Sequence, residues 1–319
     1  MQIVSRLNLA TIEKKLPSYI GYVYAVLSNS IFVLGHYFVQ KISKRFSADQ
    51  VLFYVGVQLF LYNYATVKAQ KISCCPKIPH TTRMLLLRAI FGFVAGIFFY
   101  RGLPMVPLSE GIVVQMLTPV ITGILAIMLL REKYDMTLLI TTILSVTGVL
   151  LITKPDFIFG EETQQTNEYP QRTFGLFLLL LCSFLASFSQ ILIKKLGSVS
   201  NAYNTGMYLG LGFALSSAVC QITKGVDVGN ASIYIWLAVI GLSRYLAHVL
   251  LNKSYAFGDA GKIALFAYLQ VPFGYIIDIF IVGRSPDFYS GLGSVSIFSS
   301  VFVTLYKQYQ TKKVGGGTK

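Results

Sequence analysis

Residues 115–135 read QMLTPVITGILAIMLLREKYD, an apolar run that contains one proline and stops abruptly at charged residues. The charges that end the run are Arg131, Glu132, Lys133 and Asp135. Pro119 lies inside it, where a proline removes one backbone hydrogen bond of a helix and clashes with the preceding turn. The stretch therefore predicts a membrane-spanning helix with a bend near Pro119.

The composition of the whole chain is that of a membrane protein. Its 319 residues are 54% hydrophobic and only 13% charged, and the mean hydropathy is +0.63, whereas soluble domains carry about 25% charged residues. Apolar runs of about 20 residues, the length that crosses a bilayer, recur from end to end. They are too long and too uniformly apolar to be the strands of a membrane barrel. A sizeable soluble domain is therefore excluded.

The sequence predicts an all-α polytopic membrane protein with ten transmembrane helices. If the amino end is cytosolic, most of the 27 Lys and Arg residues fall in segments on the cytosolic side, so the positive-inside rule places both termini in the cytosol. This pattern explains the net charge of +14 without nucleic acid as a partner. The expected spans are 18–39, 48–68, 83–103, 108–130, 136–153, 173–194, 202–222, 232–252, 262–283 and 288–306.

The most polar connection divides these spans into two sets of five. An odd number of spans in each half makes the second half enter the membrane from the opposite side, so we expect two inverted five-helix repeats. The segment YLQVPFGYIIDIFIVGRSPD at 268–287 overlays the opening run, with Pro272 on Pro119, and the two prolines are candidate bending or gating positions. The expected units are a first repeat (17–154), a polar linker (155–171), a second repeat (172–308) and a cytosolic tail (309–319).

The same segments carry a family resemblance. TPVITGILAIMLLREKYD, followed by TGVLLITKPDFIFG at 147–160, resembles the first-half signature of EamA-type members of the drug/metabolite transporter superfamily. The chain is most similar to the G group of the solute carrier 35 family, as LQVPFGYIID and the glycines at 291 and 293 also indicate. The resemblance covers about residues 18–306 and implies a ten-helix carrier with a central site. Arg284 follows Gly283 where many relatives have a Gly-Glu pair, so a role of Glu132 is not duplicated.

Charged residues inside a span are costly, which makes them candidates for function. Arg244 lies midway along the eighth span, and His248 and Asn252 follow at steps of four on the same helix face. This face is expected to line a wet cavity, with structural pairing as the alternative. Arg88, about five residues inside the third span, is a second candidate for substrate binding, with snorkelling to the interface as the alternative. Asp278 is expected to balance a buried charge, couple to a proton or reach the outer interface.

Uncharged polar residues form stripes on several spans. Ser183, Ser187, Gln190 and Lys194 share one face of the sixth span. Interhelical hydrogen bonds would explain any single stripe, whereas several stripes that converge with Arg244 favour a polar cavity. The remaining substrate-binding candidates are Gln115, Gln190, Tyr268 and Asn29. GFVAG at 92–96 and GMYLG at 206–210 match the small-xxx-small pattern of close helix packing.

The leading hypothesis is a secondary transporter that moves a small organic anion by alternating access, because a deep guanidinium suits a carboxylate or a phosphate ester. The alternatives are a proton-coupled exporter of neutral or cationic metabolites and a membrane scaffold without flux. The sequence contains no phosphate loop, zinc helix or nucleophile elbow, so neither an enzyme, a cofactor nor a metal is expected. The expected partners are a small-molecule substrate, the lipid bilayer and a second copy in a homodimer. The sequence predicts a multi-pass protein of either the plasma membrane or an endomembrane.

Overall fold

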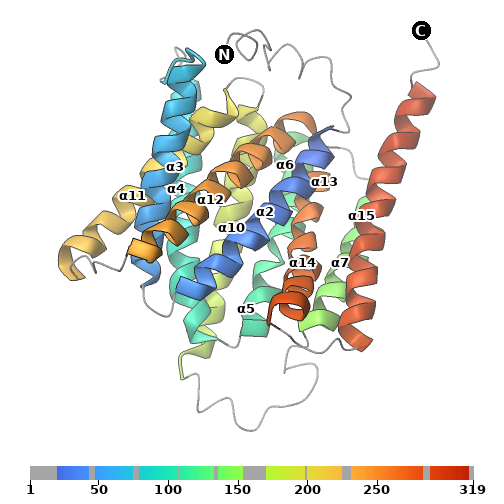
Figure 1. Ribbon diagram of the computed structural model, residues 1–319. Helices are drawn as coiled ribbons and strands as arrows, with labels where there is room; N and C mark the ends of the chain where they lie inside the picture. Colours follow the sequence, from blue (N-terminus) through green and yellow to red (C-terminus); the bar gives the residue numbers. More distant parts are fainter. Residues whose placement is uncertain are drawn as a thin grey trace.

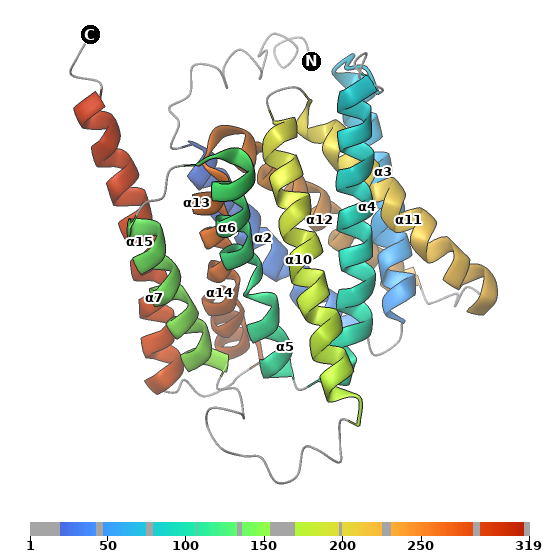
Figure 2. The same ribbon diagram turned by 180° about the vertical axis from the view of Figure 1, so that it is seen from behind.

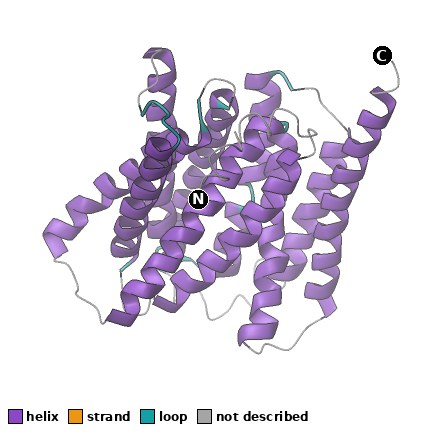
Figure 3. Cartoon of the chain, turned by 45° about the horizontal axis from the view of Figure 1, so that its top comes forward, coloured by secondary structure: helices purple, strands orange, loops and turns teal. Residues whose placement is uncertain are grey.

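The fold is a bundle of long helices. A computed structural model describes residues 20–42, 47–74, 79–106, 108–132, 136–153, 170–197, 200–224, 231–282 and 288–315. Strands are absent from these ranges (Figure 3). Most of the polar linker and the amino-terminal segment lie outside the described residues.

The first half contains four uninterrupted helices and one interrupted segment. The interrupted segment consists of α5 and α6, with a turn at Met116 and Leu117 between them. The 3-10 turn η2 (Leu103–Met105) precedes it. The bounds of the helices are α2 (Ile20–Ile42), α3 (Ala48–Ala69), α4 (Pro79–Gly102), α5 (Leu108–Gln115), α6 (Thr118–Leu130) and α7 (Met136–Thr153).

The second half repeats this plan. Its fourth segment is again interrupted, here by a 3-10 turn between two short α-helices and by a π-helical turn at its end. The bounds are α10 (Arg172–Leu196), α11 (Ala202–Lys224), α12 (Ala231–Phe257), α13 (Ala260–Leu265), η3 (Phe266–Leu269), α14 (Gln270–Ile277), η4 (Asp278–Val282) and α15 (Phe288–Gly315).

Successive segments run in alternate directions through the bundle (Figures 1 and 2). We call the end where α2 begins and α15 ends the terminal end. The opposite end, where α7 ends and α10 begins, is the linker end. Because α2 begins at the terminal end and α10 at the linker end, the two halves pass through the bundle in opposite senses (Figure 1).

Seven described segments are long and apolar enough to cross a membrane, by length and composition. α2, α3 and α11 are of similar length but are not among them, so ten spans are not established by this criterion. Buried polar residues lie in all three helices. Asn29, Asn63 and Asn204 are at most 4% exposed, so these side chains face neighbouring helices and not the surroundings of the bundle.

The packing of helices is symmetric between the two halves: each of the main pairs of helices in contact has an equivalent pair when every helix is replaced by its counterpart in the other half. The second helices of the halves, α3 and α11, pack on each other, and so do the fifth helices, α7 and α15. The first helix of each half packs on the third helix of the other half, in the pairs α2–α12 and α10–α4. The largest apolar core cluster gathers Tyr255, Phe266, Tyr268 and Ile297 from the second half with Ala126 from α6.

Glycines allow close packing where equivalent helices of the two halves cross, at α3–α11 and α7–α15. A Cβ atom built on Gly210 of α11 would lie 2.5 Å from the Phe60 nitrogen and 2.9 Å from the Gly56 oxygen of α3. The packing role predicted for GMYLG is therefore confirmed. At the α7–α15 crossing, the hydroxyls of Ser145 and Ser300 are 2.6 Å apart and form a buried hydrogen bond.

Candidate functional site

Both interrupted segments break next to a proline. Pro119 is the second residue of α6, directly after the turn at 116–117. Pro272 is the third residue of α14, directly after η3. The spans predicted at 108–130 and 262–283 are present as candidate membrane spans at Gly111–Leu130 and Ala260–Ile281. Each is divided into separate helices, where the sequence predicted a bend. Irregular backbone at membrane depth needs hydrogen-bond partners from the protein or a wet cavity.

Serines of α10 supply such partners to the break in the first half. The Ser183 hydroxyl lies 3.0 Å from the Val114 carbonyl oxygen, and the Ser187 hydroxyl lies 3.0 Å from the Thr118 carbonyl oxygen. Each hydroxyl also contacts a carbonyl of α10, so its single proton is shared. Both serines are fully buried. The expectation that they line a cavity was therefore wrong, and this part of the stripe joins α10 to the interrupted segment.

Replacing both Ser183 and Ser187 by alanine is expected to lower the free energy of unfolding by about 1 kcal/mol, since interhelical hydrogen bonds in membranes average about 0.6 kcal/mol each. Thermal denaturation of the purified double variant measures this. Ser294→Ala is the matched control, because the Ser294 hydroxyl donates within α15, to the Ser290 carbonyl, and has no interhelical partner among the described residues. A double variant as stable as this control would show that the contacts to the break contribute nothing.

Two further candidates serve as interhelical contacts. The Gln190 side-chain oxygen accepts hydrogen bonds from Thr122 of α6 at 2.9 Å and from Tyr255 of α12 at 2.7 Å. The Asn29 side-chain oxygen accepts from Gln270 of α14 at 2.7 Å. α10 is the first helix of the second half, and α2 is the first helix of the first half. Each interrupted segment is therefore hydrogen-bonded to the first helix of the other half. The two interrupted segments are thus held in matching ways.

The predicted polar face of α12 turns toward α2. The Arg244 guanidinium lies 5.5 Å from the centre of the Phe32 ring, and the His248 ring meets the same phenyl ring edge-on at 5.1 Å. Arg244 also lies close to Gly35, where a Cβ atom would be 3.7 Å from its Nε. Both side chains are half-buried. Arg244 and His248 are therefore brought together, as the spacing predicted, and share one aromatic neighbour.

Arg88 lies deep in the bundle. It is only 2% exposed, so the alternative in which it snorkels to the interface was wrong. The helix begins at Pro79, earlier than expected, so Arg88 is nine residues inside it, roughly 13 Å along the axis at 1.5 Å per residue. Nε and Nη1 of Arg88 and Nδ1 of His248 are buried, and none of these atoms has a hydrogen-bond partner in the part of the chain described.

Three candidates lie apart from this group. Tyr268 is fully buried in the core cluster, and its hydroxyl has no partner among the described residues. Gln115 is half-buried at the end of α5. Asp278 begins the π-helical turn η4, and its side chain lies outside the described part of the structure.

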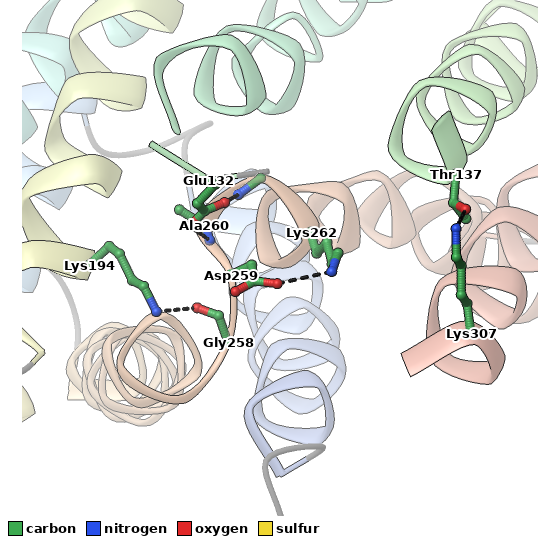
Figure 4. A network of polar contacts seen from close by, with 9 residues as sticks. Glu132, Thr137, Lys194, Gly258, Asp259, Ala260, Lys262 and Lys307 are labelled. Atoms are coloured by element: carbon green, nitrogen blue, oxygen red, sulfur yellow. Dashed lines mark hydrogen bonds and ion pairs between the residues drawn. The ribbon is translucent and has the colours of Figure 1, made fainter. Parts of the chain in front are cut away.

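The terminal end is held together by polar contacts (Figure 4). Arg131 adopts a left-handed conformation with φ 55° at the end of α6, and Glu132 follows it. The Glu132 carboxylate accepts the backbone N–H groups of Ala260 at 2.6 Å and Gly261 at 3.1 Å, at the start of α13. Glu132 is thus an anchor between the two halves. The other contacts at this end join Lys194 to the Gly258 carbonyl, Lys307 to Thr137, and Lys262 to Asp259.

A cavity of about 180 Å³ lies between the terminal ends of α3, α10, α11 and α12. Asn252, which continues the face of Arg244 and His248 by one more turn, is among its lining residues. The Asn252 amide nitrogen donates to the Ala202 carbonyl at 3.0 Å. Other polar residues of the lining are Gln70, Ser200, Asn201, Tyr203, Thr205 and Lys253.

Comparison with known proteins identifies the family. The model of the EamA-like transporter family matches residues 19–154 and 173–306, one match in each half of the bundle. The chain belongs to the EamA-like transporter family. It is therefore an integral, multi-pass membrane protein and a transporter of small solutes.

Relatives of this EamA-like transporter include a protein of the expected subgroup. "Solute carrier family 35 member G1" of Homo sapiens is 25% identical over 298 residues, which cover 92% of this chain and 81% of that protein. The "Riboflavin transporter" of Vibrio cholerae is 25% identical over 209 residues, or 65% of each chain. One crystal structure shares the fold with a TM-score of 0.74 at 15% identity, covering 90% of this chain and 95% of that chain.

Some residues that shape the site of this EamA-like transporter escaped sequence reasoning. Phe32 is one aromatic residue in an apolar span, and nothing in its surroundings marks it as the neighbour of Arg244. Tyr255 bonds to Gln190 and continues the face of Arg244, His248 and Asn252, three residues further along α12, whereas Gln270 belongs to no polar stripe. The position of Gln270, two residues before Pro272, is the signal that would have found it.

Proposed function

We propose that the chain is a secondary transporter that moves a small organic anion by alternating access. The observation that carries this proposal is the packing of the two halves, whose helix pairs stay the same when the halves are exchanged. With α2 and α10 starting at opposite ends, this packing supports two inverted repeats related by a two-fold axis in the membrane plane. Such repeats can exchange conformations, which gives two states that open to opposite sides.

The proposal includes ten membrane spans. The seven segments that meet the length and composition criterion are joined by α2, α3 and α11, whose polar residues face the bundle interior. The terminal end is then cytosolic, because the loops and tails at that end carry most of the basic residues. The contacts of Glu132 and Lys194 at this end support a state that is closed toward the cytosol.

The proposal that the substrate is an anion rests on Arg244. Its guanidinium is half-buried near the middle of α12, where a charge is expensive unless it serves a function. A guanidinium presents paired donors that fit a carboxylate or a phosphate in bidentate geometry. The neighbouring Phe32 ring holds the guanidinium in place by a cation–π contact.

Flux into proteoliposomes tests the substrate class. We expect uptake of labelled succinate or glycerol 3-phosphate by the wild-type protein. We expect a loss of at least about tenfold in Arg244→Ala, because one charge-assisted hydrogen bond is worth about 1.5 kcal/mol or more. Arg101→Ala, an exposed arginine at the linker end of α4, is the matched control. Unchanged anion uptake in Arg244→Ala would remove this residue from the substrate path.

A second candidate is a transporter of neutral or cationic metabolites, with His248 or Asp278 coupling flux to protons. It is favoured by the relative that is named a riboflavin transporter. Uptake of labelled riboflavin in the same vesicles, dependent on the proton gradient and insensitive to Arg244→Ala, would support this candidate against the first. A chain that carries no solute in either assay would fit the scaffold hypothesis.

A further inference from the structure

We propose that Arg88, with His248 beside it, binds the anionic group of the substrate in the interior of the bundle. This inference rests on the proposed function for its direction, and it adds a second arginine to the site that Arg244 begins. It starts from a buried arginine whose Nε and Nη1 have no hydrogen-bond partner among the described residues.

The guanidinium of Arg88 is enclosed but not satisfied. The residue is 2% exposed, and Nε and Nη1 have no partner among the residues that the structure describes. Its polar contact to a neighbouring helix is made by its backbone carbonyl, which accepts from Ser189 of α10 at 3.3 Å. A buried charge without a partner destabilises a fold by several kcal/mol, so a structural arginine at this depth would be expected to have a carboxylate partner.

His248 of α12 carries another buried atom without a described partner. Nδ1 of His248 is buried without a hydrogen-bond partner in the described part of the chain. The imidazole is within electrostatic range of both Arg88 and Arg244, and the Arg244 guanidinium shares the Phe32 ring with it as a neighbour. Described carboxylates are found only toward the ends of the bundle, in Asp49, Glu132 and Asp259. An anion placed beside His248 would be attracted by both guanidinium groups.

The surroundings of Arg88 come from three helices. A Cβ atom on Gly92, one turn along α4, would lie 3.3 Å from Nη1 of Arg88 and 2.7 Å from Leu209 of α11. The glycine therefore leaves the guanidinium room between α4 and α11, while Ser189 holds α10 against the same turn. Arg88 lies on α4 of the first half, whereas α10, α11 and α12 belong to the second half, so a ligand held by Arg88 contacts both repeats. A ligand in that position is sensitive to their relative movement.

Thermal stability separates a binding role of Arg88 from a structural role. We expect Arg88→Met, measured in anion-poor detergent buffer, to raise the Tm by about 3 °C or more, because an apolar residue of similar size replaces a buried charge for which the described residues supply no carboxylate partner. We expect succinate or inorganic phosphate, at constant ionic strength against chloride, to raise the Tm of the wild-type protein but not that of Arg88→Met. Arg83→Met, an exposed arginine on the same helix, should behave as the wild type does.

Three outcomes would overturn the inference: a lower Tm of Arg88→Met in anion-poor buffer, a stabilisation by anions that persists in this variant, or no stabilisation of the wild type by either anion.

Flux measurements add a second readout. The Arg88→Lys variant keeps the charge but loses the planar guanidinium fork, and should raise KM on the order of tenfold. Wild-type flux with an unchanged KM in Arg88→Lys and Arg88→Met would reject only the role of Arg88. Anion stabilisation that requires Arg88, without wild-type flux, would instead reject the proposed function.

Discussion

Replacing Gly210 by leucine is expected to prevent α3 and α11 from packing and to leave little folded protein. A Cβ atom at this position would lie 2.5 Å from the Phe60 nitrogen, 2.9 Å from the Gly56 oxygen and 3.0 Å from the Leu59 carbonyl carbon. All three are backbone atoms of α3, so no side chain can rotate away and the two helices must separate. We expect a loss of more than about 3 kcal/mol, the upper part of the range for overpacking.

The measurement is the fraction of detergent-solubilised Gly210→Leu that elutes as a single species, together with its Tm. Gly291→Leu is the matched control, because Gly291 is an exposed glycine of α15 whose Cβ would meet nothing within 4 Å. This control should be as stable as the wild type or slightly more stable, since leucine favours a helix more than glycine does. A Gly210→Leu variant with the wild-type Tm would show that the close α3–α11 crossing is not required for folding.

Replacing Glu132 by glutamine is expected to weaken the closure of the terminal end. The carboxylate accepts two N–H groups, those of Ala260 and Gly261, with one oxygen each. A glutamine has one acceptor oxygen, so its NH2 group would face an N–H donor, and the favourable charge at the start of α13 would be lost. We expect a destabilisation of about 2 kcal/mol, the value of a hydrogen bond to a charged group.

Labelling of a cysteine introduced at the buried Ala260 reports the closure directly. In a background without the four native cysteines, Glu132→Gln should increase the labelling rate by a membrane-impermeant thiol reagent applied to the terminal end. Asp259→Asn is the control, because the Asp259 side chain is 49% exposed and its one ion pair among the described residues is with Lys262 three residues away, a contact worth about 0.5 kcal/mol or less. Equal labelling in Glu132→Gln and the wild type would show that Glu132 does not hold this end closed.

The helical membrane architecture and several contact residues could be predicted from the sequence because they depend on local pattern. The α-helical class follows from the length of the apolar runs, and the spacing of glycines in GMYLG predicted a close crossing. The partner of that crossing, Gly56, could not be predicted, because it depends on which helices meet. Pro119 indicated a bend, but a single proline does not distinguish a bent helix from the two separate helices α5 and α6.

The candidate site was predictable only in part for the same reason. The stripe on α10 was found correctly as a polar face, but its partners are backbone carbonyls of an interrupted helix, which have no signature in the sequence. The depth of Arg88 was underestimated because the helix begins at Pro79, and HTTR at 80–83 is polar enough to be read as a loop. The absence of a described partner for Nε and Nη1 of its guanidinium is a property of the tertiary packing alone.

Counterflow in proteoliposomes tests most directly whether this EamA-like protein is an alternating-access carrier of anions. Vesicles are loaded with unlabelled succinate or glycerol 3-phosphate and diluted into a trace of the same labelled anion. In an alternating-access carrier, one site is exposed to each side of the membrane in turn. The label should then accumulate transiently in the vesicles above its equilibrium level, and Arg244→Ala should abolish this accumulation. Uptake by the wild type that does not depend on the preloaded anion would contradict alternating access of an anion site.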